Sequence, residues 1–158
     1  MDQTRLLFPL ALVKRLPMNK FIVPFLFLIG LGLLCDSTSG AEPRPEDATQ
    51  PVAVEWLALV DTGKYLESWE KMSLGFKKEV SKRKWKSTVE KIRGPLGKFA
   101  SRKLKSAEYS KELPGAPEGE YVVLQYDSAF ERKPAAVEKL TLILGQDLDW
   151  RVSSYAVK

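Results

Sequence analysis

Hydrophobic and polar residues repeat along this chain with two periods, one before Gly97 and another after it. Between residues 52 and 93, apolar residues recur every three or four positions, the spacing of one face of a helix. The expected apolar faces are Ala53, Trp56, Leu57 and Val60 in a first helix, Tyr65, Trp69 and Met72 in a short second helix, and Trp85, Val89 and Ile92 in a third. We therefore predict three helices in the first half of the domain.

Polar residues, prolines and glycines mark the ends of these helices. We expect Asp47 or Thr49 to cap the first helix, with Pro51 in its opening turn, where a missing N–H does no harm. Ser81 is expected to cap the third helix, and Gly94-Pro95 to end it. The residues before the first helix, EPRPEDATQP (42–51), are rich in proline and acid and are interpreted as a short tether.

After Gly97 the pattern changes to the alternation of strands. We predict strands over 98–113, which is polar and irregular, and over Tyr121–Phe130, Val137–Leu144 and Trp150–Val157. In the second strand, Val122, Leu124, Tyr126 and Phe130 share one face. Helices followed by strands on short loops indicate an α+β fold, with three N-terminal helices packed on one bent, four-stranded antiparallel sheet. This order of elements is that of an NTF2-like or cystatin-like cone.

The loop LPGAPEGE (113–120) fits two interpretations, a binding loop or the turn of a hairpin. It contains no residue that binds metal strongly or attacks a substrate. Leu113 precedes a proline and is expected to be extended, and Pro114 to Gly119 then reverses the chain. We interpret the loop as the connection between the first and second strands.

The N-terminal segment has the layout of a secretory signal peptide. Phe21 to Leu34 is a run of fourteen residues without charge, preceded by Lys14, Arg15 and Lys20. Small residues follow in STSGA, so we expect cleavage between Ala41 and Glu42 and an exported protein, periplasmic or extracellular. The expected organisation is signal peptide 1–41, tether 42–51 and one α+β domain 52–158.

Two alternatives for this segment are weaker. An uncleaved anchor needs about 20 apolar residues to cross a bilayer, more than this run provides, so we expect no stable membrane span after cleavage. A lipoprotein would use Cys35, but Leu34 stands where a small residue is needed. Because Met18 would itself open a normal signal peptide, residues 1–17 could derive from a mis-assigned upstream start.

Composition limits the chemistry of the expected mature domain. The chain has no histidine, and its single cysteine, Cys35, lies in the segment expected to be removed. Nucleophilic triads and transition-metal sites usually need imidazole or thiolate, so we expect no catalysis, no metal and no cofactor. The best remaining acid–base pairing is Asp127 with Tyr126 or Tyr155. Asp127 and Tyr126 are neighbours on a strand and point to opposite faces, which makes a shared cavity impossible.

Aromatic residues at helix and strand spacing fit either a filled core or a ligand pocket between helices and sheet. The ligand-pocket candidates are Trp56, Tyr65, Trp69, Trp85, Tyr126 and Trp150.

Charge is distributed unevenly. From Lys77 to Lys105 there are twelve Lys and Arg against two Glu, whereas the residues from Ser106 onward carry six basic and nine acidic side chains. The basic block fits either a solvated surface or a face for an anionic envelope component or an acidic protein. The basic-face candidates are Lys82, Lys86, Arg93, Arg102, Lys103 and Lys105. Nucleic acid is not expected as a partner, because no recognition motif is present.

The predicted sheet has apolar residues on both faces. Val123, Ile143 and Val157 are expected on the face opposite that of Leu140, Leu142 and Leu144. A homodimer through the outer face of the sheet is therefore a second expected partnership.

Several segments resemble one bacterial family, the "domain of unknown function 4019". They are EWLALVDTGKYLESWE (55–70), FKKEVSKRKW (76–85), RGPLGKFASRKLKSAEYSKELPGAPEGEYVVLQYDSAF (93–130), AAVEKLTL (135–142) and WRVSSYAVK (150–158). The resemblance implies an exported protein and supplies no activity or site residue. We therefore predict a small, exported, non-catalytic binding or interaction module of the cell envelope. The alternative is a cavity-type carrier of small ligands, or an NTF2-like enzyme with an Asp/Tyr site.

Overall fold

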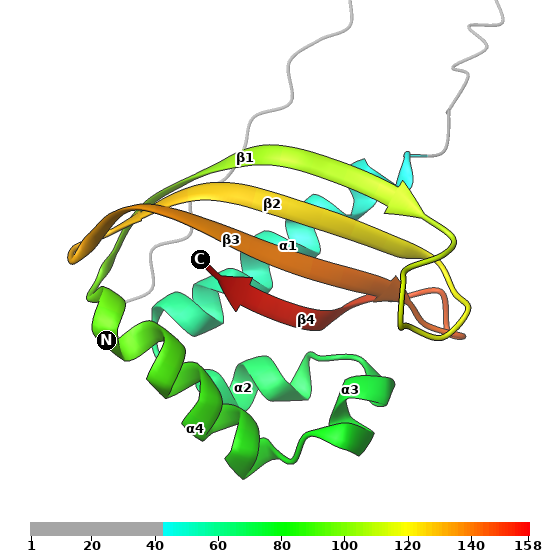
Figure 1. Ribbon diagram of the computed structural model, residues 1–158. Coiled ribbons are helices and arrows are strands. Elements are labelled where there is room, and N and C mark those ends of the chain that lie inside the picture. Colours follow the sequence, from blue (N-terminus) through cyan, green and yellow to red (C-terminus); the bar gives the residue numbers. More distant parts are fainter. Residues whose placement is uncertain (1–42) are drawn as a thin grey trace, which may run out of the picture. The chain divides into compact units, whose positions relative to one another are not determined.

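The computed structural model describes residues 43–158, in which helices cover one face of a four-stranded antiparallel sheet (Figure 1). The helices are α1 (Pro45–Asp61), α2 (Tyr65–Glu70), α3 (Leu74–Glu79), α4 (Lys82–Arg93) and the single 3₁₀ turn η1 (Gly94–Leu96). The strands are β1 (Phe99–Ser110), β2 (Tyr121–Phe130), β3 (Lys133–Leu144) and β4 (Trp150–Val157). The predicted α+β class is confirmed.

The first helix begins earlier than predicted. Helix α1 begins at Pro45, so most of the segment expected to be a tether is helical. Arg44 occupies the N-cap position without a side-chain cap, and Pro51 lies inside the helix, so the predicted cap at Asp47 or Thr49 is wrong. A proline in the opening turn loses no helical hydrogen bond, which lets Pro45 start the helix. The predicted apolar face of α1 is buried.

Residues 43–158 contain one α-helix more than the three predicted. Helix α3 begins after Ser73, whose hydroxyl oxygen accepts a hydrogen bond from the Phe76 N–H. Helix α3 was not predicted, because its six residues bury no apolar face. The predicted cap of α4 is confirmed, since Ser81 Oγ accepts a hydrogen bond from the Lys84 N–H.

The strands follow one another in the sheet in the order β1-β2-β3-β4. The bounds predicted for β2 and β4 are confirmed, whereas β3 begins four residues earlier than expected, at Lys133. Antiparallel pairing of β1 with β2 confirms that the loop 113–120 connects the two strands of a hairpin. Register shifts at Phe99/Ser101 and Ser128/Phe130 lie at the same end of the sheet, where bulges bend the strands.

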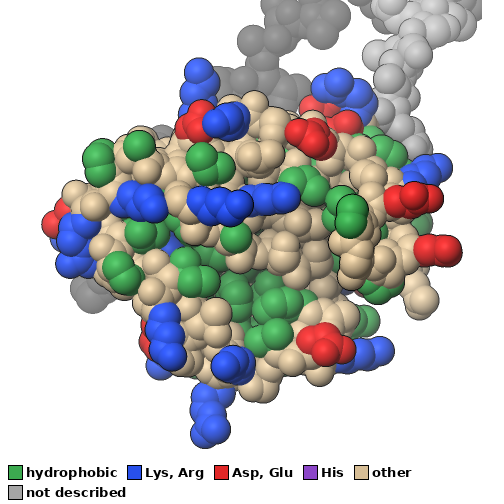
Figure 2. Space-filling model, in the orientation of Figure 1, with side chains coloured by type: hydrophobic (Ala, Val, Ile, Leu, Met, Phe, Trp, Pro, Cys, Tyr) green, Lys and Arg blue, Asp and Glu red, His purple; other side chains and the backbone are tan. Residues whose placement is uncertain are grey.

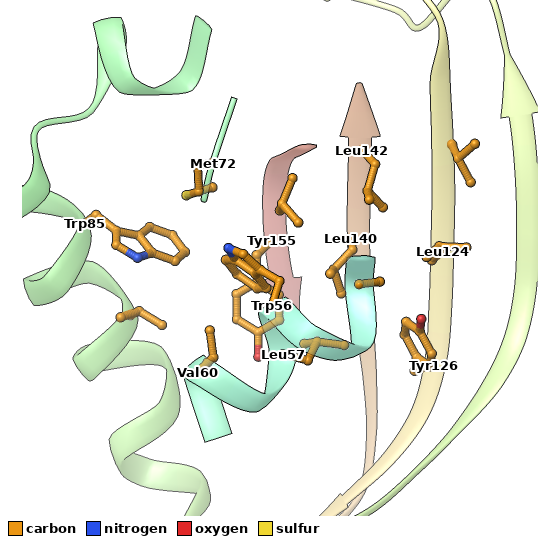
Figure 3. Close-up of a cluster of buried hydrophobic side chains, with 14 residues drawn as sticks. Trp56, Leu57, Val60, Met72, Trp85, Leu124, Tyr126, Leu140, Leu142 and Tyr155 are labelled. Carbon is orange, nitrogen blue, oxygen red and sulfur yellow. The ribbon is translucent and has the colours of Figure 1, made fainter. Parts of the chain in front are cut away.

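Aromatic and aliphatic side chains fill the space between helices and sheet (Figure 3). The Trp56 ring lies 5.9 Å from the Trp85 ring and 5.3 Å from the Tyr155 ring, between ring centroids. Both indole N–H groups donate to Ser68, which is fully buried: Trp56 Nε1 to its carbonyl oxygen and Trp85 Nε1 to its hydroxyl. Large aromatic surfaces are therefore buried with their polar atoms satisfied.

The predicted signal peptide, its cleavage point and Cys35 lie outside the described residues. Within residues 43–158, no helix combines the length and the apolar composition needed to cross a membrane.

Candidate functional site

The six predicted ligand-pocket residues lie in or against the core. Trp56, Trp85 and Tyr126 are at most 4% exposed, and Tyr65, Trp69 and Trp150 pack against them while partly buried. Trp69 Nε1 donates to the carbonyl oxygen of Val80, 2.8 Å away. These rings pack in or against the core, and two of them, Trp56 and Trp150, also line one groove of about 460 Å³.

The six predicted basic-face residues do not form one surface. Lys82 and Lys86 lie on α4, where they pair with Glu70 and Glu90. Lys103 and Lys105 lie on β1, on the opposite face of the sheet from the helices. Arg93 and Arg102 leave the predicted face altogether, because their guanidinium groups point into the interior and are 5% and 12% exposed.

The two arginines belong to a buried network of charges that the sequence analysis missed. Asp61, the last residue of α1, accepts hydrogen bonds from Arg93 Nη2 at 2.6 Å and from Arg102 Nη1 at 2.9 Å. Glu138, on β3, contacts Arg93 at 3.1 Å and Arg102 at 2.6 Å. Each carboxylate thus bridges both arginines, and the four groups form a closed ring without net charge.

Two hydroxyls complete the network around Glu138, which is fully buried. Ser128 Oγ and Tyr155 Oη each donate to the Glu138 carboxylate at 2.6 Å. Phenyl rings cover the other faces of the arginines: the Arg93 guanidinium lies 4.3 Å from the Phe130 ring centroid, and Arg102 lies 4.3 Å from that of Phe99. Arginine favours such sites because its flat cation stacks on rings while its N–H groups bind carboxylates.

The network perturbs the groups around it. Burial alone would lower the pKa of Arg102. The hydrogen bond to Asp61 and the negative charges of Glu138 and Asp61 outweigh this effect, so the pKa of Arg102 lies above its usual value. Burial and the Glu138 charge raise the pKa of the Tyr155 hydroxyl, so it stays protonated and donates. Tyr126 Oη is also buried and has no hydrogen-bond partner among the described residues, and burial raises its pKa as well.

The chemistry available to this network is limited by its own pairing. Both arginines pair with carboxylates; the Glu138 carboxylate accepts four hydrogen bonds and the Asp61 carboxylate accepts three. The network holds the C-terminal ends of α1 and α4 to the sheet. Among the described residues, no group of His, Cys, Asp or Glu side chains is arranged to hold a metal ion.

The sequence does contain a signal for the network. Strand β2 sends its even-numbered residues inward, including Ser128, and β3 sends Glu138 inward with Leu140 and Leu142. A carboxylate and a hydroxyl at inward positions of neighbouring strands require a buried partner. The partners come from distant segments, so the spacing alone does not identify them.

The outer face of the sheet is the surface that the helices leave open. Figure 1 shows α1 behind the strands, and Figure 2 shows Lys and Arg side chains in a row across the side facing the viewer. Four lysines lie on this face, on β1, on β3 and after β4, together with two carboxylates; they are Lys103, Lys105, Lys139, Lys158, Glu108 and Asp127. The face is therefore basic.

A groove of about 500 Å³ crosses the bent end of this outer face. Small side chains line much of it, among them Ser101, Ala129 and Ala135, and Asp127 and Lys158 also belong to the lining. Asp127 is exposed and pairs with Lys105 at 3.2 Å, whereas Tyr126 is buried on the inner face, so these two neighbours share no cavity.

Comparison with known proteins places the chain in a family without assigning an activity. Residues 52–155 match the model of one family, described as "Protein of unknown function (DUF4019)". A search of curated proteins finds no match to the chain. Because the match covers most of the sequence and nearly all of the sheet, the chain belongs to this DUF4019 family.

Proposed function

We propose that this chain is a small, non-catalytic binding module of the bacterial cell envelope, and that it binds through the outer face of its sheet. The inner face supports this proposal, because packed rings and a charge-neutral network occupy it. The helices lie over that inner face, so a partner approaches the sheet from the other side. Export to the periplasm or beyond rests on the N-terminal sequence pattern.

The single observation that carries the proposal is the combination of lysines and a groove on one open face. Lys103 and Lys139 project from β1 and β3 on either side of β2, and the small-residue groove lies beside them. Lysine ammonium groups attract an anionic partner and raise its association rate, and the attraction weakens as salt increases. A groove lined by small side chains lets an extended chain approach the sheet closely.

We infer that the occupant is an acidic protein segment. The groove lining contains no aromatic ring on which a sugar would stack. A homodimer through the same face would bring the lysines of two copies together, and lysine is depleted from protein interfaces. An anionic lipid surface is flat and would make no use of the groove.

Titration calorimetry with a short poly-glutamate peptide tests this proposal. The unmodified protein should bind the peptide with an affinity that falls as salt increases. The double charge reversal Lys103→Glu/Lys139→Glu should reduce the affinity about tenfold or more, since one decade corresponds to about 1.4 kcal/mol. Vesicles of phosphatidylglycerol serve as the second probe and should bind less well.

The double variant Arg83→Glu/Lys84→Glu is the matched control. It makes the same change in net charge on exposed positions of α4, away from the outer face. It should retain most of the affinity. Equal losses in the two double variants would show that only net charge matters, and preferential binding to vesicles would replace the acidic segment with a lipid surface.

The fold supports a further assignment, to the NTF2-like or cystatin-like cones. In these cones a bent antiparallel sheet closes over helices, and here the bulges bend the sheet at the end where the network lies.

One observation favours the alternative function, a carrier or an enzyme with an interior site: the unpartnered Tyr126 hydroxyl. Native mass spectrometry of protein purified from its own envelope decides between them, since a co-purifying small molecule would support the interior site.

A further inference from the structure

The turn between β3 and β4 places a leucine in a backbone conformation that suits glycine. Leu148 has a φ of 63°, and among the described residues it is the only non-glycine residue with a positive φ. Its side chain is 77% exposed. Glycine or asparagine would occupy this position with less strain and would expose less apolar surface. Strain of this kind persists where the surrounding structure enforces it, and it marks candidate functional positions.

The surrounding turn holds Leu148 rigidly. Its N–H donates to the Gly145 carbonyl at 3.0 Å, and the Gly145 N–H donates to the Asp149 carbonyl at 2.9 Å. Arg151 donates to both Asp147 carboxylate oxygens, at 2.7 and 2.6 Å, and to Asp149 at 3.1 Å. The backbone of the turn is thus held in one conformation, which lowers the entropy lost when a partner covers the turn.

Two grooves flank this turn. One, of about 460 Å³, runs between the turn and helices α1 and α2, and its lining includes Leu148 and Trp150. The other, of about 550 Å³, lies between the turn, the start of α3 and the β1–β2 loop, and its lining includes Leu74. Leu74 is 70% exposed. The grooves therefore offer apolar anchors on both sides of one rigid turn.

The charges of these grooves are opposite to those of the outer face. Five carboxylates and three cations line the two grooves: Glu55, Glu70, Glu118, Asp147, Asp149, Lys71, Lys78 and Arg151. Lys71 pairs with Glu55, Arg151 pairs with Asp147 and Asp149, and Glu70 pairs with Lys82 of α4, so the five carboxylates exceed the four cations by one. The excess of carboxylates repels an anionic membrane and attracts a cationic partner.

We propose that the β3–β4 turn and its two grooves are a docking site for a basic protein segment that carries apolar side chains. Leu148 and Leu74 pack against the apolar side chains of the partner, and the groove carboxylates pair with its Lys or Arg residues. This site is separate from the outer face of the sheet and does not depend on the function proposed for that face.

Nuclear magnetic resonance of the purified protein tests the site with a short synthetic peptide of alternating lysine and leucine. The methyl signals of Leu148 and Leu74 should shift on addition of this peptide. A peptide with glutamate in place of lysine should cause no such shift. Comparable shifts with the glutamate peptide, or shifts caused by phosphatidylglycerol vesicles instead of the lysine peptide, would overturn the proposal.

The variant Leu148→Gly separates binding from folding. It should weaken binding of the lysine–leucine peptide about tenfold or more, the loss typical of a buried anchor, while the melting temperature stays the same or rises. Leu66→Ala, which removes an exposed leucine of α2 outside both grooves, is the control and should leave the affinity unchanged. Undiminished affinity in Leu148→Gly would contradict the site even if the protein is more stable.

Discussion

Glu138 and Lys139 are adjacent in β3, yet their side chains lie in opposite environments. The Glu138 carboxylate is fully buried and contacts two arginines and two hydroxyls, whereas Lys139 lies exposed on the outer face. The same alternation places buried Tyr126 beside exposed Asp127 in β2. Two adjacent charged residues of one strand can therefore differ in role, one paired in the interior and the other available to a partner. Only the alternation of side chains along the strand tells which residue lies on which face.

The largest effect is expected from breaking the inner network. Glu138→Gln keeps the size of the side chain but leaves Arg93 and Arg102 with a buried excess of positive charge. The free energy of unfolding should fall by about 3–5 kcal/mol, as for the loss of one partner from a buried ion pair. Denaturant unfolding measures this loss.

Lys139→Gln is the control for that experiment, since it removes a charge from the next residue on the outer face. Its effect should stay within about 0.5 kcal/mol, as for ordinary surface substitutions. If both variants lost the same stability, the two faces of the sheet would not differ as described.

A smaller effect is expected at the hydrogen-bonded serine of the core. Ser68→Ala removes the hydroxyl that accepts the Trp85 Nε1 hydrogen bond, while the Ser68 carbonyl still accepts from Trp56. The unsatisfied indole N–H should lower the free energy of unfolding by about 1–3 kcal/mol. The variant Ser153→Ala, at a partly buried position of β4, should lower the free energy of unfolding by less. Thermal unfolding of the two variants measures the difference.

The smallest effect is expected at the exposed ion pairs of the β3–β4 turn. The hydrogen bonds from Arg151 lower the pKa of Asp147 to about 2. A carboxyl group with a lowered folded pKa contributes stability above its unfolded pKa, and that contribution is lost as the pH falls toward 2. Because Asp147 is exposed, the contribution should be small compared with that of the buried network.

Carbon-13 resonances of the carboxyl groups report this titration directly. The Asp147 signal should titrate near pH 2 in the unmodified protein and at the ordinary pH for aspartate in Arg151→Gln. An unchanged titration in that variant would show that Arg151 does not set the pKa.

Periodicity predicted most of the fold because most elements bury an uninterrupted apolar face. The apolar face of α1 was predicted correctly for this reason, as was the alternation of inward and outward side chains in β2 and β3. The errors lie where local rules compete: Pro45 starts α1 in a segment whose composition suggested a tether, and α3 is too short to show a helical period.

The candidate site was less predictable than the fold. Arg93 and Arg102 belong to a basic stretch of sequence, which suggested a solvated surface, but each points inward to carboxylates from other elements. Their partners, Asp61 and Glu138, are separated from Arg93 by 32 and 45 positions along the chain. Only the fold brings such groups together, so composition identified the charges without their pairing.

The central claim is that a partner binds to the outer face of the sheet while the inner face stays closed. Methyl-labelled protein titrated with poly-glutamate tests this most directly, because alternate residues report the two faces. Signals of Ala129, Ala135 and Val137 should shift, and those of Val122, Leu140 and Leu142 should not. Shifts confined to the inner set would contradict the claim and would place the binding site in the interior.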